Sequence, residues 1–574
     1  MKPLLRILRY LRPYRSLAVL TLLCAACATG FELLPPWAIK IIIDDVIQAK
    51  QAALLPGALG LLVGAYVLKN VFASLRIRFN NQLEQAVMHD LRNGVFGALQ
   101  GLSLNYYEQR STGEIMSRVM NDTEQVERIF IDGLESVLTA GLTLVGITAM
   151  LFVINWQLAV LSLVPVPFLV LAASWFTKRV HGHYRDIRKR SADLSGYLQD
   201  ALSGIRETMG FVRHWHEQER FDRLSRDYRG ANLKAMVLWS MYSPGMILLA
   251  GLGTVLILWF GAGEVLAGRL TVGELVLFLS YLALFYVPIN QIHSVNHMLQ
   301  HALAASDRVF DVLDAVPEVA DKPGVVAPIH RLCGAVRFED VYFYYRPEVP
   351  VLTGVTVSIS AGERVALVGP SGAGKSTLLK LLMRFYDVQM GAVMIDGRDV
   401  RDFPQGYLRQ QIGFVQQEPF LFNGTIRENI LYGDLGADRI RLESATRAAR
   451  AHEFIEALPE GYDTWIGERG VKLSVGQKQR VSIARALLKD PPIVICDEAT
   501  SNIDTETELK IREALAELTR GRTTFVVAHR LSTLHDADRI LVIDRGRLVE
   551  DGRHDDLLRH GGLYAGLYEA QFQI

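Results

Sequence analysis

Gly369-Pro-Ser-Gly-Ala-Gly-Lys-Ser-Thr377 is the most informative segment of the C-terminal part of the chain. It matches the phosphate-binding pattern G-x-x-x-x-G-K-[ST], with an apolar strand at 365–368 before it and a helical stretch after it. Glycines let backbone N–H groups close around phosphate oxygens, and a helix start attracts negative charge. Because both flanks fit, a chance glycine-rich turn is a poor alternative. The predicted nucleotide-binding residues of this loop are Gly369, Pro370, Ser371, Gly372, Ala373, Gly374, Lys375, Ser376 and Thr377.

Four side chains are expected to carry the chemistry. Lys375 is expected to reach the β- and γ-phosphates, and the Ser376 hydroxyl to bind Mg²⁺. A second apolar strand, 493–496, ends in Asp497 and Glu498. Asp497 suits the Mg²⁺ shell, and Glu498 suits a general base that polarises the attacking water. The acidic pair alone would equally suit a helix start, but the phosphate loop upstream favours the catalytic interpretation.

The composition divides the chain into a part in lipid and a part in water. Half of the 574 residues are hydrophobic and the mean hydropathy is +0.18, yet 21% are charged, which neither a uniform soluble protein nor a pure membrane bundle would combine. The 61 basic residues balance the 61 acidic ones, which argues against nucleic acid as the main partner. Four cysteines cannot form a disulfide framework.

Runs without Asp, Glu, Lys or Arg locate the membrane part at 136–177, 235–263 and 275–306. The first run is long enough for two spans, and two weaker runs lie nearer the N-terminus. Arginine and lysine gather before the first span and after the second and fourth, so the positive-inside rule places both termini and the two long loops in the cytoplasm. The six expected spans lie near residues 17–43, 52–75, 132–154, 157–177, 236–260 and 272–294.

Each of the two long cytoplasmic connections is better explained by helices that continue below the membrane than by a structureless loop. Breaks are expected near 105–113 and 204–210. The predicted fold is therefore an all-α bundle of six membrane-spanning helices with long cytoplasmic extensions, followed by an α/β phosphate-loop ATPase domain. Prolines and a glycine after residue 316 indicate a linker between them. The expected domain limits are 1–320, 321–334 and 335–574.

The stretch Leu473-Ser-Val-Gly-Gln477, which precedes Asp497, resembles the signature motif of ATP-binding-cassette (ABC) proteins. The commoner form has glycine where Val475 stands. The membrane half resembles ABC exporters in the motif that begins Thr112-Gly-Glu114 and in 304–314. The resemblance implies that Tyr345 stacks on adenine and that His529 is a switch histidine. It also implies that Gln417 senses the γ-phosphate and the membrane domain and joins Ser376 and Asp497 around Mg²⁺. The other residues that it assigns to the nucleotide site are Ser474, Val475, Gly476, Gln477 and Asp504.

The resemblance also implies a dimer. Each ATP would lie between the phosphate loop of one chain and the signature helix of another, with Ser474 and the Gly476 amide on the γ-phosphate; Val475 is then a mild departure. Intact Glu498 and His529 favour two working sites and hence a homodimer, although a heterodimer with a second half-transporter stays open. The breaks at 105–113 and 204–210 would be coupling helices that dock on the nucleotide domains.

The expected function is ATP-driven export or flipping of an amphipathic substrate, such as a lipid, drug or peptide, across the cytoplasmic membrane by alternating access. The expected cofactors are ATP and Mg²⁺, and the expected partners are a second copy and membrane lipids, with no nucleic acid. The alternative from another class is a nucleotide-gated channel or a regulatory membrane protein on the same fold. Intact Glu498 favours the pump.

Polar residues recur on one face of the last span at helical spacing: Asn290, His293, His297 and His301. A solvated vestibule wall is the favoured interpretation, ahead of substrate contact and of metal binding through His293 and His297. In the first span, the intramembrane charge Lys40 is expected to pair with Asp44 one turn later.

Overall fold

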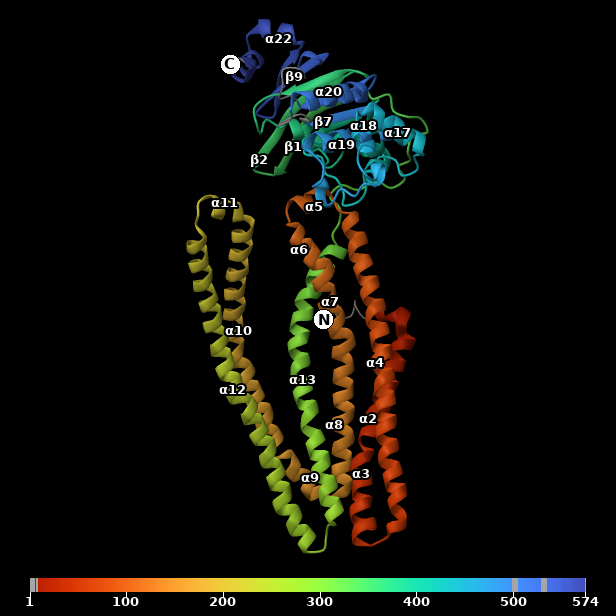
Figure 1. Cartoon of the computed structure of the whole chain (residues 1–574), viewed down its shortest axis with the longest axis vertical. Helices are drawn as coiled ribbons and strands as arrows, with labels where there is room; N and C mark the ends of the chain where they lie inside the picture. The colour runs from red at the N-terminus through yellow and green to blue at the C-terminus, as the bar shows by residue number, and fades with distance from the viewer. Residues whose placement is uncertain (1–5, 7–8, 498–503, 528–533, 573–574) are drawn as a thin grey trace. The chain divides into compact units, whose positions relative to one another are not determined.

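The computed structural model describes residue 6 and residues 9–497, 504–527 and 534–572. The chain divides into two compact units (Figure 1). The first comprises Met1–Gln100 and Thr112–Ala315, and the second comprises Gly101–Ser111 and Val316–Ile574. A short internal segment of the chain therefore belongs with the C-terminal unit.

Long helices build the first unit. In the described part of the chain, five helical runs are long and apolar enough to cross a membrane. They contain five of the predicted spans: Arg9–Gln48, Ala52–Gln100, Thr112–Ile154, Trp156–Ser203 and His214–Leu266. The sixth predicted span lies in a further helix whose described apolar stretch is Val272–Phe285. The principal helices are α2 (Arg15–Glu32), α3 (Leu34–Ile41), α4 (Leu55–Gln100), α6 (Thr112–Ser117), α7 (Thr123–Arg128), α8 (Leu134–Ile154), α9 (Trp156–Leu163), α10 (Pro165–Ser203), α11 (Ile205–Gly210), α12 (His214–Leu266) and α13 (Val272–Leu313).

The expectation that helices continue far beyond the membrane is confirmed. Helix α4 has 46 residues and α12 has 53. At about 1.5 Å of rise per residue, α4 is about 69 Å long, more than twice the roughly 30 Å of a hydrocarbon core. The predicted turn between the third and fourth spans is also present, because the Asn155 side chain accepts hydrogen bonds from the N–H groups of Gln157 and Leu158 and so begins α9.

The expected pairing of Lys40 with Asp44 is wrong. Lys40 Nζ instead lies 3.1 Å from Glu274 Oε1 on α13. Asp44 accepts hydrogen bonds from the Thr271 hydroxyl, at 2.6 Å, and from the Gly273 N–H, at 2.8 Å. Asp44 thus joins the first span to the beginning of α13, where a negative charge is favourable because it faces the positive end of the helix dipole.

Two sheets build the second unit. A four-stranded antiparallel sheet has the order β2-β1-β4-β5, and a six-stranded sheet has the order β10-β9-β3-β8-β7-β6, parallel except for β10. Strands β3 and β7 are apolar and almost wholly buried, as parallel strands covered on both faces must be. The strands are β1 (Val336–Arg346), β2 (Val349–Ile359), β3 (Arg364–Val368), β4 (Met390–Ile395), β5 (Arg398–Asp399), β6 (Ile412–Val415), β7 (Ile493–Asp497), β8 (Thr523–Val527), β9 (Arg539–Asp544) and β10 (Arg547–Gly552).

Helices cover the larger sheet and frame two hydrophobic clusters, one toward the four-stranded sheet and one under α19. The described helices of this unit's C-terminal part are α14 (Lys375–Leu382), α15 (Gln405–Gln410), α16 (Ile426–Leu431), α17 (Arg439–Ala448), α18 (His452–Glu456), α19 (Val475–Lys489), α20 (Thr505–Thr519), α22 (His554–His560) and α23 (Leu563–Phe572).

Helix α5 (Leu104–Glu108) lies between α4 and α6 in the sequence but belongs to the second unit. Leu104 packs against the hydrophobic cluster that lies toward the four-stranded sheet. Asn105 Nδ2 donates a 2.6 Å hydrogen bond to Glu318, and the Val319 N–H donates to Ser103 Oγ. Residues 105–111 of the predicted break thus belong to the second unit, whereas 112–113 begin α6 in the first unit.

Candidate nucleotide-binding site

Four adjacent parallel strands, in the order β3-β8-β7-β6, deliver the candidate residues to one edge of the sheet. The phosphate loop follows β3, Asp497 ends β7, and Gln417 comes two residues after β6. In open α/β sheets ligands bind at the carboxyl ends of the strands. Glu498 directly follows β7 and His529 comes two residues after β8, but both lie outside the described residues and stay predictions.

Glycine is required at two positions of the phosphate loop. Gly369 has φ +147°, and a Cβ there would lie 2.0 Å from the Ile543 carbonyl oxygen. Gly374 has φ +108°, and a Cβ there would lie 2.7 Å from Leu352 Cδ2. The chain therefore passes through a space too narrow for a side chain before α14 begins at Lys375. This tight turn into a helix N-terminus suits a phosphate.

Lys375 is a buried cation within the loop. Its side chain is nearly inaccessible, and Nζ donates hydrogen bonds to the carbonyl oxygens of Gly369, at 2.7 Å, and Pro370, at 2.9 Å. The loop backbone thus holds the ammonium group against the turn whose N–H groups would bind phosphate. A buried positive charge in a glycine-rich loop is an arrangement that suits the phosphates of a nucleoside triphosphate.

Tyr345, near the end of β1, presents part of its ring to solvent. Its exposure is 39%, and its hydroxyl lies 3.2 Å from Thr377 Oγ1 of the phosphate loop. Phe343 and Tyr386 meet its ring edge-on, at centroid distances of 4.9 and 5.2 Å. The structure therefore brings the predicted adenine-stacking residue to the phosphate loop and fixes one edge of its ring.

The predicted signature motif begins α19. Ser474 is the N-cap, and its side chain and that of Gln477 form a reciprocal capping box. Val475 is 53% exposed, whereas Gly476 is buried. Asp504 is the N-cap of α20, and its side chain accepts a 3.0 Å hydrogen bond from the Thr507 N–H. The signature helix thus offers an exposed N-terminus with an extra side chain at Val475.

Gln417 is exposed, and its backbone carbonyl oxygen accepts a 2.9 Å hydrogen bond from the side-chain amide of Gln479 on α19. This bond ties the residue between the sheet edge and the signature helix.

The polar residues proposed for the substrate path, Asn290, His293, His297 and His301, all belong to α13, but their side chains lie outside what the structure describes. Their role stays a prediction.

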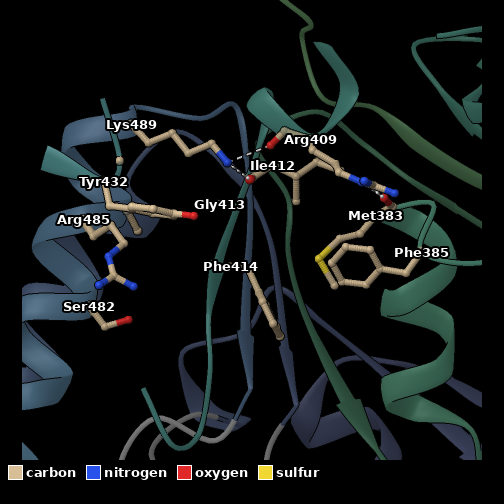
Figure 2. Close-up of a pocket in the computed structure, with 12 residues that line it drawn as sticks. Met383, Phe385, Arg409, Ile412, Gly413, Phe414, Tyr432, Ser482, Arg485 and Lys489 are labelled. Atoms are coloured by element: carbon tan, nitrogen blue, oxygen red, sulfur yellow. Dashed lines mark hydrogen bonds between the residues drawn. The ribbon is translucent and has the colours of Figure 1, made fainter. Parts of the chain in front are cut away.

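A groove of about 280 Å³ beside α19 was not indicated by any sequence motif (Figure 2). Lys489 crosses one end, where Nζ donates to the carbonyl oxygens of Arg409 and Ile412. Tyr432, 60% exposed at the end of α16, and Phe414 make its walls partly aromatic. The lining residues are Met383, Phe385, Arg409, Ile412, Gly413, Phe414, Tyr432, Gly433, Ser482, Arg485, Ala486 and Lys489.

Long apolar helices in one unit and a phosphate loop at a sheet edge in the other define a membrane-embedded ATPase. Two family models match, the ABC transporter transmembrane region over residues 18–289 and the ABC transporter model over residues 352–501. The chain belongs to the ABC transporter family, as an ATP-hydrolysing exporter.

Relatives match over nearly the whole chain. The ABC transporter ATP-binding protein YknV of Bacillus subtilis is 38% identical over 99% of this chain and 94% of its own. The ATP-dependent lipid A-core flippase of Syntrophus aciditrophicus is 37% identical, with the same coverage. A solved structure of a bacterial Atm1-family ABC exporter with ATP bound has a TM-score of 0.82 and 33% identity and covers 97% of this chain and 98% of that chain.

Proposed function

We propose that this chain is one half of a homodimer that couples ATP hydrolysis to the movement of an amphipathic substrate across the cytoplasmic membrane, with its termini and nucleotide unit in the cytoplasm. The observation that carries the proposal is the membership of α5 in the nucleotide unit, although its neighbours in sequence, α4 and α6, belong to the membrane unit. A change in the nucleotide unit is thereby passed through peptide bonds to two helices of the membrane unit.

Magnesium-bound ATP, when present, supplies an electrophilic γ-phosphorus and partly neutralised phosphate charge. Lys375 and the loop N–H groups would hold the phosphates, and Ser376, Gln417 and Asp497 would hold the metal. Glu498 would accept a proton from the attacking water, and His529 would orient the γ-phosphate. Tyr345 would bind the base through its exposed ring face.

The second chain would complete each site. Ser474 and Val475 are exposed at the N-terminus of α19, so this helix start suits the γ-phosphate on the facing phosphate loop of the partner copy. The groove beside α19 would receive the second break, α11, of the partner copy. Two observations support this: Met209 and Phe211 are 60% and 71% exposed, and the groove itself presents aromatic walls.

Among the amphipathic substrates, a lipid is the one to test first. The lipid A-core flippase of Syntrophus aciditrophicus aligns over nearly its whole length with this chain. The long apolar helices of the membrane unit would lie in direct contact with lipid. A peptide or drug, in contrast, must first enter the membrane before it reaches these helices.

Translocation in proteoliposomes tests the proposal. Fluorescent phospholipid in the outer leaflet should move faster with Mg·ATP, and its residual accessibility to a membrane-impermeant quencher reports the movement. Lys375→Ala should abolish the ATP-dependent part. A gate would behave differently: Glu498→Gln, which retains nucleotide but hydrolyses slowly, would still permit sustained movement. Absence of ATP-stimulated movement for lipids, drugs and peptides alike would refute export.

A further inference from the structure

Glu108, the last residue of α5, uses both carboxylate oxygens to contact the region that follows the phosphate loop. Oε1 lies 2.8 Å from Lys380 Nζ on α14, and Oε2 accepts a 2.6 Å hydrogen bond from the Tyr386 hydroxyl. Burial alone would raise the pKa of Glu108, but hydrogen bonds from Lys380 and Tyr386 and the charge of Lys380 lower it below its ordinary value. The carboxylate is thus ionised at neutral pH.

Both partners of Glu108 also contact the ring of Tyr345. Lys380 Nζ lies 5.6 Å from the ring centroid, within the range of a cation–π interaction. The Tyr386 ring meets the Tyr345 ring at 86° with centroids 5.2 Å apart, a favourable edge-to-face arrangement. Since Tyr345 is only partly buried, these two contacts and Phe343 determine which way its exposed face points.

We propose that Glu108 is a positioning residue for the base of the nucleotide: by holding Lys380 and Tyr386, it keeps Tyr345 in the orientation that stacks on adenine. The inference rests on the proposed function, in which Tyr345 binds adenine. Loss of the Glu108 contacts loosens Lys380 and Tyr386 against the Tyr345 ring and so weakens base binding. By reciprocity, a bound base stabilises α5 in the nucleotide unit, so base occupancy is reported to the segment between α4 and α6.

A purely anchoring role for Glu108 makes a different prediction. Asn105 anchors the same helix through its 2.6 Å hydrogen bond to Glu318, and among the described residues no hydrogen bond or ion pair joins Asn105 itself to Lys380 or Tyr386. Asn105→Ala is therefore the matched control. If general loosening of α5 weakens nucleotide binding, this variant will do so as well as Glu108→Gln.

Calorimetry on the full-length protein in nanodiscs tests the inference with two probes, magnesium-bound adenylyl imidodiphosphate and inorganic tripolyphosphate, which has no base. Glu108→Gln should raise the Kd of the adenine nucleotide about threefold to tenfold, as expected for loss of a charge-assisted contact. It should leave the Kd of tripolyphosphate unchanged. Lys380→Met should repeat this pattern, Lys380→Arg should restore most of the affinity, and Asn105→Ala should change neither Kd.

Tyr345→Ala separates this inference from the proposed function. That change should weaken binding of the adenine nucleotide alone, and adding Glu108→Gln should then have no further effect. If Tyr345→Ala leaves adenine binding unchanged, the assigned role of Tyr345 fails. Positioning by Glu108 is overturned if Tyr345→Ala raises the Kd of the adenine nucleotide but Glu108→Gln does not. It is also overturned if Glu108→Gln raises the Kd of tripolyphosphate equally, or if its effect adds fully to that of Tyr345→Ala.

Discussion

Arg384 offers the sharpest test of how the C-terminal unit is held together. This side chain is 1% exposed and donates hydrogen bonds to two carbonyl oxygens, Ala320 at 2.8 Å and Phe403 at 3.2 Å. It also pairs with Asp387 and Asp321, at 3.0 and 3.3 Å. The planar guanidinium therefore joins the segment that enters the unit to the end of α14 and to the loop before α15.

Arg384→Met retains most of the buried stem but removes all four contacts. Each carbonyl that loses its partner costs about 1 kcal/mol. Each carboxylate pair adds about 0.5–1 kcal/mol, since both aspartates are partly exposed. The sum is about 3–4 kcal/mol. For a unit of this size we expect the melting temperature to fall by roughly 6–16 °C.

Scanning fluorimetry of the purified protein should measure this fall in the transition of the nucleotide unit. Arg331→Met is the control, because Arg331 pairs with Asp490 where both side chains are 52% exposed. That variant should lower the melting temperature by at most about 4 °C. If Arg384→Met and Arg331→Met melt within 2 °C of each other, the buried contacts of Arg384 do not stabilise the unit more than an exposed ion pair does.

Three further predictions concern the nucleotide site and its surroundings. Glu498→Gln should bind Mg·ATP normally but hydrolyse it at least about a hundredfold more slowly, because the cradle stays and the base is lost; near-normal steady-state hydrolysis would remove Glu498 from its role. In mixed dimers, Lys375→Ala in one chain and Ser474→Arg in the other should leave one composite site intact, whereas both changes in one chain damage both sites; equal residual ATPase activity would contradict composite sites. Burial is the main cause that lowers the pKa of His554, and the nearby His535 lowers it further. The Nδ1 atom of His554 also lies 2.6 Å from the Tyr564 hydroxyl. The unfolded chain then binds the proton more tightly, so this contribution to stability is full above about pH 6.5 and is lost as pH falls below it; His554→Gln should flatten the melting temperature between pH 5.5 and 7.5, and an unchanged pH profile would exclude His554 as the cause.

Local patterns predicted the parts of the molecule that local chemistry determines. The glycine spacing from Gly369 to Gly374 identified the phosphate loop because backbone conformation requires glycine there. The strand that ends at Asp497 was recognisable because buried parallel strands are continuously apolar. Ser474 and Gln477 form the cap that their spacing implies.

Contacts between residues far apart in the sequence could not be predicted in this way. Lys40 was expected to pair one turn along its own helix, yet its partner Glu274 lies 234 residues away. Spacing rules describe one helix, whereas neighbouring helices decide which carboxylate a long side chain reaches. For the same reason Glu108 and Lys380 gave no signal, because each is an ordinary helix residue until the fold brings them together.

The placement of α5 has a consequence for folding during synthesis on the ribosome. Residues 101–111 leave the ribosome some two hundred residues before residue 316 begins the rest of the unit to which they belong. The Leu104 side chain and the Glu108 carboxylate must therefore wait for their partners until Tyr386 has been synthesised and the sheet has closed. An ATPase fragment that starts at residue 316 would fold without this helix and would expose the surface that Leu104 covers. Until the rest of the unit has folded, Leu104 lacks the hydrophobic cluster against which it packs, so α5 should be more accessible to proteases on an incomplete chain than on the folded protein.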